Sequence, residues 1–235
     1  MKPFLLFLSV VSALTGTQAS AQQETEFGSR IMRPSPAEPD YRSKLSKGNQ
    51  ARAMVDDFAL CTLQYSRKAV ASALALTPGD TDSHSSLNKL AQPRCLRDAT
   101  LRMPPELLRG ALFRAKLLDE FVDRRLVFAA QPLDPTRFAH DLENRQQVQH
   151  ALLQDFASCV VRAEPAAAAA FVMEEAGSKK EQKALDDLGP ALGPCLSNGQ
   201  KIKLSRDVLG AQLAEALYHE LVAEIKDEAS LEASE

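Results

Sequence analysis

Asp57-Phe58-Ala59-Leu60-Cys61 returns later in the chain as Asp155-Phe156-Ala157-Ser158-Cys159, and this repeated stretch decides the expected fold. A second pair follows each copy after a similar interval, as Pro93-Arg94-Cys95-Leu96 and Pro194-Cys195-Leu196. Alignment of these positions gives an internal duplication with a period of about 98 to 100 residues. Each copy therefore carries one pair of cysteines.

The first 21 residues have the pattern of a signal peptide. Lys2 supplies a positive start, residues 4–14 are apolar, and Ala19-Ser20-Ala21 is a small-x-small cleavage site. The apolar run is shorter than the ~20 residues that a membrane span needs. We expect the mature protein to begin near Gln22, to be periplasmic or secreted, and to have no membrane span.

Export determines how the four cysteines are interpreted. In an oxidising compartment they favour two disulfides, for which sequence alone permits three connectivities. If each copy folds as a unit, Cys61 pairs with Cys95 and Cys159 with Cys195. Each bridge would close a loop of roughly 35 residues, worth roughly 3 to 4 kcal/mol in the chain-entropy model. A redox or metal protein stays open as a third interpretation, although zinc-ligand spacing and Cys-x-x-Cys are both missing.

The composition predicts an all-α protein. Apolar residues make up 45% and charged residues 25% of the chain, and alanine and leucine, which favour helices, are abundant. Loss of residues 1–21 would remove one lysine and no acid, which leaves 27 basic and 31 acidic residues and a net charge of −4. This balance favours neither nucleic acid nor an anionic membrane as a partner.

We expect two pseudo-repeats of about four helices each, with one disulfide inside each repeat. The predicted organisation is a signal peptide at 1–21, a disordered leader at 22–49, helical repeat 1 at 50–126, a linker at 127–141, helical repeat 2 at 142–226 and an acidic tail at 227–235.

The first helix of each copy is expected to turn one apolar face inward. That face consists of Val55, Phe58, Cys61 and Tyr65 in one copy, and of Leu152, Phe156, Cys159 and Ala163 in the other. Pro165 favours the start of a new helix, and alignment places the matching break near Arg67.

Later elements also occur in matched pairs. The second helices should end at Pro78-Gly79 and at Gly177. The third helices should begin at Asp82-Ser83 and at Ser178, where Glu181 completes the spacing of a capping box. They should stop at Pro93 and at residues 190–194, which would place Cys95 and Cys195 just beyond a helix end.

The fourth helix of each copy is predicted to be the longest and to open at Pro104-Pro105 and at Ser205. It carries an apolar stripe at four-residue steps, formed by Phe113, Leu117 and Phe121 in one copy and by Leu213, Leu217 and Leu221 in the other. Such a stripe predicts a buried core.

A search for chemistry finds no catalytic motif. Nucleophile elbows, paired metal-binding histidines, phosphate loops and haem attachment sites are all missing from the sequence. The histidines are scattered, at His84, His140, His150 and His219. His219-Glu220 comes nearest to an acid–base pair, but adjacent residues point to different helix faces. The acid pairs Asp119-Glu120 and Glu174-Glu175 are typical of a hydrated surface. We assign no catalytic, metal or cofactor residue.

The fourth helices differ in charge. Arg109 and Arg114, with Arg124-Arg125 after them, make the first one basic, whereas Glu215, Glu220 and Glu224 make the second one acidic. This asymmetry would let one copy face the other or let two molecules associate, and it is also the kind of variation that surfaces accumulate.

With its Phe-x-x-Cys, Pro-Cys-Leu and Gly-Ala segments in tandem, the chain resembles uncharacterised exported bacterial helical proteins. The resemblance covers roughly residues 51–125 and 147–225 and implies a scaffold without a known activity. Two functions stay open. One is a binding or structural module of the bacterial cell envelope, with envelope proteins or a second copy as partner. The other is an exported, hydrolase-like enzyme whose site is assembled only in the fold.

Overall fold

The computed structural model describes residues 44–96, 102–121, 126, 128, 132–196, 202 and 204–232, with side chains as far as Ile225. Within these ranges the protein is all-helical and has no strand, as the sequence predicts. The elements are α1 (Lys47–Ala75), α2 (Ser83–Asn88), α3 (Pro93–Leu96), α4 (Pro105–Glu120), the 3₁₀ helix η2 (Pro135–Phe138), α5 (Arg145–Ala163), α6 (Pro165–Met173), α7 (Lys179–Leu192) and α8 (Arg206–Glu232). The predicted signal peptide and most of the predicted leader lie outside the described residues.

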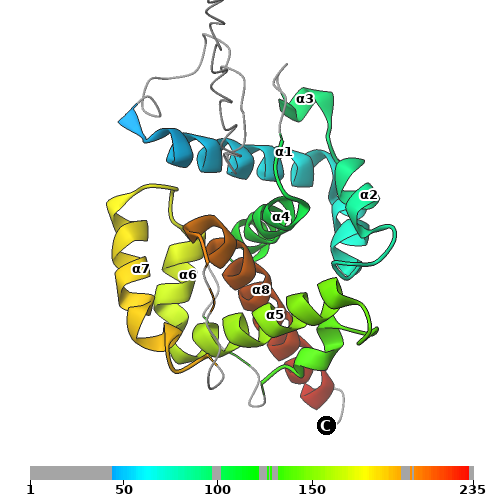
Figure 1. Cartoon of the computed structure of the whole chain (residues 1–235), viewed down its shortest axis with the longest axis vertical. Helices are drawn as coiled ribbons and strands as arrows, with labels where there is room; N and C mark the ends of the chain where they lie inside the picture. The colour runs from blue at the N-terminus through cyan, green and yellow to red at the C-terminus, as the bar shows by residue number, and fades with distance from the viewer. Residues whose placement is uncertain are drawn as a thin grey trace, which may run out of the picture.

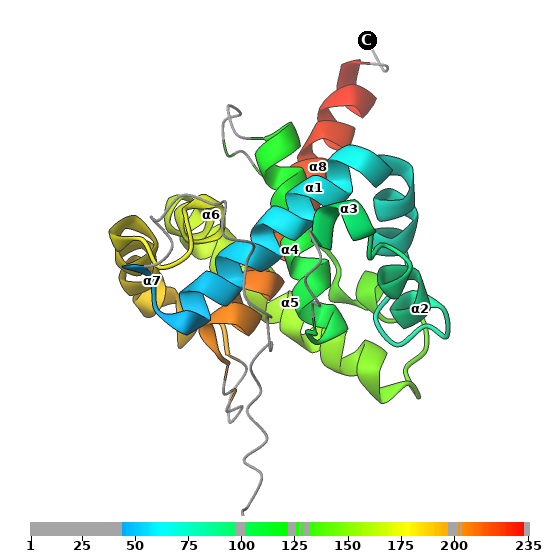
Figure 2. The ribbon, with the colours of Figure 1, turned by 90° about the horizontal axis from the view of Figure 1, so that it is seen from above.

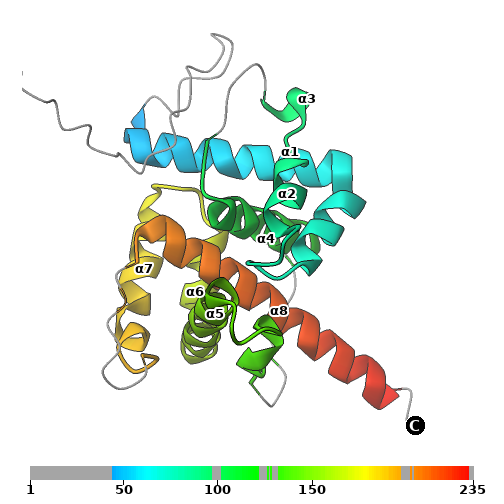
Figure 3. The same cartoon turned by 45° about the vertical axis from the view of Figure 1, so that its right-hand side comes forward.

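Helices α4 and α8 pack against each other at the centre of the molecule. Helix α1 lies across α4, and α5 lies across α8 (Figure 1). Seen from above, α6 and α7 form one flank and α2 forms the opposite one, with α3 beside α1 (Figure 2). The end of α8 extends away from the other helices (Figure 3). We call residues 44–121 the first half and residues 132–232 the second half.

Local sequence accounts for where the helices begin. The side chains of Ser46, Asn144 and Ser178 each accept a backbone N–H from the first turn of the following helix. Proline in the first turn opens α4 and α6, where no intrahelical hydrogen bond is lost.

Backbone features recur 98 residues apart. Ser66 interrupts α1 with φ −137° and ψ 36°, and Glu164 separates α5 from α6 with φ −134° and ψ 66°. Gly79 and Gly177 both have positive φ, at +99° and +79°, which glycine adopts at little cost. The break predicted near Arg67 is therefore confirmed. The two glycines are left-handed as predicted, but α1 ends at Ala75 and α6 at Met173, so both glycines lie in the turn after the helix and not at its end.

The inward face of the first helices is rotated from the predicted one. Tyr65 is 60% exposed and Leu152 is 52% exposed, so the prediction that both point inward is wrong. The buried face of α5 is centred on Phe156, Ala157, Val160 and Val161, and α1 matches it with Phe58, Ala59, Thr62 and Leu63. This rotation moves the cysteines to the edge of the buried face, where they meet their partners.

Several predicted lengths also differ from the structure. Helix α2 has 6 residues and ends well before Pro93, whereas its counterpart α7 has 14 and continues through Pro190. Proline is tolerated there because it removes only one hydrogen bond next to the helix end. Helix α4, with 16 residues, is shorter than the 29-residue α1, so the fourth helix is not the longest in the first half.

The chain between the two halves is more than a connector. Its described part contains η2, and Phe138 and Ala139 are buried against α5. At the ends, α1 already begins at Lys47 inside the predicted leader, and α8 continues to Glu232 through most of the predicted acidic tail.

Both disulfides have the predicted connectivity. Cys61 is bonded to Cys95 and Cys159 to Cys195, with Cα–Cα distances of 5.7 and 5.6 Å. Each bridge lies within one half and joins its first long helix to the segment before its last helix.

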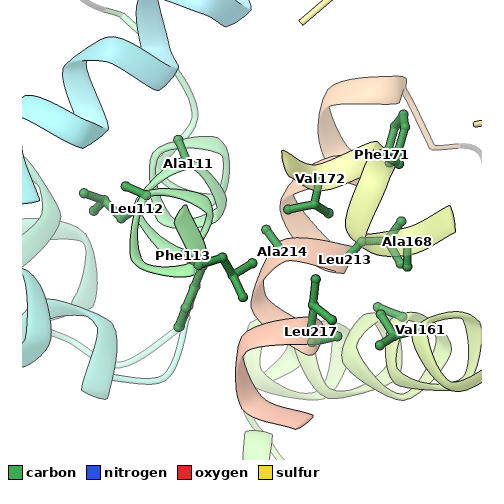
Figure 4. Packing of buried hydrophobic residues seen from close by; sticks show 14 of the residues in the cluster. Ala111, Leu112, Phe113, Val161, Ala168, Phe171, Val172, Leu213, Ala214 and Leu217 are labelled. Atoms are coloured by element: carbon green, nitrogen blue, oxygen red, sulfur yellow. The ribbon is translucent and has the colours of Figure 1, made fainter. Parts of the chain in front are cut away.

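The apolar core runs through both halves without interruption. Side chains from α4, α5, α6 and α8 meet there (Figure 4). The predicted stripe is fully inside it, since Phe113, Leu117, Phe121, Leu213, Leu217 and Leu221 are all buried. No single helix among the described residues is long and apolar enough to cross a membrane; α5 and α6 pass that test only as a pair bent by 113°.

Candidate functional site

Among the residues whose burial the structure describes, three acidic side chains are buried between the helices. Glu215 and Glu220 on α8 are 2% and 0% exposed, and Glu181 on α7 is 1% exposed. An ionised carboxylate is expensive to bury unless cations or hydrogen-bond donors surround it. The partners of these acids therefore define the strongest candidate site.

Glu215 is bound by Arg109 of α4, across the interface between the central helices. Arg109 Nε donates to both carboxylate oxygens at 3.0 Å, and Nη2 donates to Oε1 at 2.7 Å. The remaining donors of Arg109 bind the end of α1, through the carbonyl oxygens of Leu76 at 2.8 Å and Leu74 at 3.0 Å. Arg109 thus joins α1, α4 and α8 through one buried hydrogen-bond network.

Two histidines complete the surroundings of Glu215. His150 Nε2 of α5 lies 3.3 Å from Glu215 Oε1, although it is not aligned for a hydrogen bond, and His219 Nε2 lies 3.8 Å from the same oxygen. The ring of Phe138 packs edge-on against both imidazoles, with centroid distances of 5.9 and 5.4 Å.

The charge balance of this cluster favours the ionised form of the Glu215 carboxylate. Burial alone would raise the pKa of Glu215, but the charge of Arg109 and the approach of His150 and His219 outweigh it and hold that pKa well below its ordinary value. A general base needs a pKa near the working pH and a free lone pair facing substrate. Glu215 is instead enclosed by the protein and bound by Arg109. Its geometry suits a structural joint, by which we mean a buried polar contact that connects helices.

Glu220 forms a separate joint one turn further along α8. Arg162 Nη2 of α5 donates to its Oε2 at 2.5 Å, and Ser158 Oγ donates to its Oε1. Glu220 therefore faces α5, while His219 faces Glu215 and Phe138. The prediction that these adjacent residues serve different faces is confirmed.

Glu181 joins the start of α7 to the first half. Its carboxylate accepts Arg52 Nη1 at 3.1 Å and the backbone N–H of Gly177 at 2.8 Å. Arg52 Nε in turn lies 3.0 Å from Asp207 Oδ1 on α8. The predicted capping box is present in part, since Ser178 Oγ accepts the N–H of Glu181 at 3.0 Å.

Arg114 is the second arginine of α4 that caps a helix end. It donates to the carbonyl oxygens of Val172, Met173 and Glu174 at 2.7, 3.2 and 3.1 Å. Positions 172 and 174 follow the two carbonyls that Arg109 caps by 98 residues. Arg114 Nη1 also lies 3.5 Å from Asp56 Oδ2, and burial raises the pKa of Asp56 despite the opposing charges of Arg114 and Arg52.

The remaining residues singled out in the sequence lie apart from this cluster. His140 Nε2 is 3.1 Å from Asp80 Oδ1, and His84 is exposed on α2. Asp119 is held by Arg67, whose hydrogen bond lowers the pKa of that carboxyl although partial burial opposes it. The other acids are paired or exposed at the surface: Glu120 with Lys116 and Tyr218, Glu174 with Lys180, and Glu175 exposed.

Two open recesses lie elsewhere on the described surface. One, of about 330 Å³, is lined by Pro132, Leu133, Asp155, Ser158, Cys159 and Arg162. The other, of about 220 Å³, is apolar and lined by Phe156, Leu192, Gly193, Leu196, Ile202, Leu204 and Leu209. Neither contains Glu215 or its histidines. The described residues hold no group of three or more metal-ligating side chains.

The sequence contained only part of the evidence for these joints. The opposite charges of the fourth helices allowed one copy to face the other as one of three interpretations, and the structure pairs Arg109 with Glu215. The burial of His150 had no sequence marker, because it depends on Phe138 from the connecting segment. Arg124-Arg125 lie outside the described residues.

Comparisons with known proteins add no relative to this description. No protein-family model, no curated protein and no solved structure matches the chain.

Proposed function

We propose that the chain is an exported helical module of two pseudo-repeats that acts as a binding or structural element of the bacterial cell envelope. The observation that carries this proposal is the use of the buried charges. Arg109–Glu215, Arg114 with the end of α6, and Arg52–Glu181 all join the first half to the second. A scaffold needs such joints, since its task is to hold surfaces in a defined arrangement.

The duplication is supported by the backbone features that recur 98 residues apart. In addition to Ser66 with Glu164 and Gly79 with Gly177, the bridges Cys61–Cys95 and Cys159–Cys195 fall at matching places. One module copied and fused would produce this pattern.

The glycine turns support the same proposal because each contacts the start of the other half's first helix. Gly79 lies against Gln147 of α5, and Gly177 lies against Asn49 of α1. Asn49 and Gln147 are themselves 98 residues apart. Such reciprocal contacts are expected when two copies of a module pack around a pseudo-twofold axis.

Export accords with the bridges, because disulfides persist in oxidising compartments and are rare in a reducing cytosol. We place the protein in the periplasm or outside the cell after cleavage near Ala21. Its partner would be another envelope protein or a second copy of this chain.

The test is crosslinking in intact cells of the source bacterium, with the tagged full chain recovered under denaturing conditions and its adducts identified by mass spectrometry. We expect one recurrent adduct whose yield falls when excess untagged protein competes. Background adducts that competition leaves unchanged would contradict a binding module. Turnover of an ester, peptide or glycoside substrate by the purified chain would establish the enzyme alternative instead.

A further inference from the structure

The two disulfides lie in different surroundings. Cys159 is exposed and lines the recess of about 330 Å³, next to Ser158 and Arg162. Cys61 is half-buried, and neither described recess includes Cys61 or Cys95. A thiol in solution can therefore approach Cys159 through this recess, whereas Cys61 is more enclosed by the protein.

Side chains beside the first bridge add to this difference. Tyr65 lies one turn beyond Cys61 on α1, and the guanidinium of Arg94, next to Cys95, stacks over its ring at 4.7 Å from the centroid. Gln92 Nε2 also donates to Ser66 Oγ at 3.2 Å, so these two contacts together clamp α1 to the chain that leads into Cys95.

The second half lacks the residue types that form this clamp at the matching positions. Ala163 stands 98 residues after Tyr65, and no residue separates Pro194 from Cys195 where Arg94 separates Pro93 from Cys95. Ala163 is a small exposed residue, which leaves the turn beyond Cys159 open.

We propose that Cys159 is a modification site that takes a low-molecular-weight thiol, whereas the Cys61–Cys95 bridge stays closed. A thiolate attacks Cys159 Sγ, a new S–S bond forms, and Cys195 leaves as a thiolate that takes a proton from water. A second thiol can then release the first as its disulfide and leave Cys159 reduced. Access to the attacked sulfur controls the rate of each exchange.

This reaction would open the loop that contains α6 and α7 and leave the first half's loop closed. The proposal does not depend on the binding function, because it concerns the chemistry of the bridge alone.

The test exposes the folded, oxidised full chain to excess reduced glutathione near pH 8. Samples are quenched with acid at intervals, free thiols are alkylated, and peptides are mapped by mass spectrometry. We expect glutathione on Cys159 and the alkyl group on Cys195 to appear on the order of tenfold faster than any label on Cys61 or Cys95. Equal rates, or attack at the first bridge or at Cys195, would overturn the proposal.

Two controls show whether the fold causes the difference. In a denaturant that unfolds the chain, both bridges should react at similar rates; a difference that persists there would assign the effect to local sequence. Tyr65→Ala reproduces the alanine found at position 163, and because Tyr65 is exposed the variant should fold. The Tyr65→Ala variant should react with glutathione at the first bridge severalfold faster than the wild type. An unchanged rate would contradict the protection of this bridge by Tyr65 and Arg94.

Discussion

The first and second halves share the positions of their bridges, breaks and glycine turns, but they carry opposite charges where they meet. The first half supplies the buried Arg109 and the half-buried Arg114 and Arg52, and the second half supplies the buried Glu215 of α8 and Glu181 of α7. Backbone features that each half needs for its own fold are kept in both. Side chains at the shared interface instead differ, so that each half fits the other better than it would fit a copy of itself.

The largest expected effect comes from breaking this complementarity. Arg109→Met leaves Glu215 buried without a cation, which should lower the free energy of unfolding by about 3 to 5 kcal/mol in a urea titration. Arg67→Met removes the cation of the exposed pair with Asp119 and should change stability little.

A double variant tests whether the charge or the packing matters. Arg109→Met combined with Glu215→Leu should recover much of the loss, because no unpaired charge remains buried. A single Arg109→Met variant as stable as the wild type would contradict the importance of this joint.

The pH dependence should differ in sign between the two halves. The lowered pKa of Glu215 stabilises the fold above its ordinary value of 4.5, and this stabilisation is lost as the pH falls through the lowered pKa. The stability advantage of wild type over Glu215→Gln should therefore shrink on acidification.

Asp56 should behave in the opposite way. Its pKa is raised, so its ionisation costs stability as the pH rises from its ordinary value of 3.8 through the raised pKa. Relative to Asp56→Asn, the wild type should lose stability over that rise. Parallel pH profiles for the wild type and both variants would contradict these assignments.

A smaller change in stability should distinguish Gly110 from Gly210, which occupy matching Gly-Ala pairs in the two halves. A methyl group on Gly110 would overlap Ala211 where α4 crosses α8, whereas one on Gly210 would meet only Phe171, at 3.7 Å. Because the overlap includes the backbone of Ala211, the two helices would have to shift, and we expect Gly110→Ala to lower the free energy of unfolding by about 2 kcal/mol. Gly210→Ala should raise it by up to about 1 kcal/mol, because alanine favours the helix. Equal melting shifts for the two variants would refute this difference.

The last predicted change in stability concerns the two glycine turns that the halves share. Gly79→Ala and Gly177→Ala each force a side chain into a left-handed backbone conformation, at a cost of about 1 kcal/mol. At Gly177 the methyl group would also overlap Asn49, so the loss there should be the larger of the two. Gly48 lies in α1 with open space around it, so Gly48→Ala should be neutral or slightly stabilising. A loss at only one of the two turns would show that the halves are less alike there than their backbones suggest.

Features encoded by local sequence were predictable. The helical class, the caps at Ser178 and Pro105, the glycine turns and the α4 and α8 stripes follow from propensity and period. The disulfide connectivity followed from the repeated spacing. The exposure of Tyr65 was not predictable. The expected inward face was drawn through Cys61 because cysteine counts as apolar in a helical pattern. A disulfide can, however, form at the edge of the buried face, and this places Tyr65 outside it.

The joints were harder to predict because they depend on contacts far apart in sequence. Arg52 and Glu181 are 129 residues apart, and the only local sign of Glu181 was its capping-box position. The charge asymmetry between α4 and α8 was compatible with contact between them, but it did not select Glu215 over Glu224 as the partner of Arg109. The burial of His150 could not be predicted without the position of η2, because Phe138 of η2 covers it. The sequence of that segment had predicted a linker.

Mass-spectrometric disulfide mapping of non-reduced protein from the exported fraction tests the central claim most directly. We predict Cys61 joined to Cys95, Cys159 joined to Cys195, and a mature N-terminus near Gln22. Bridges between the halves, or four free thiols in a chain that retains residues 1–21, would contradict an exported scaffold of two separately bridged halves.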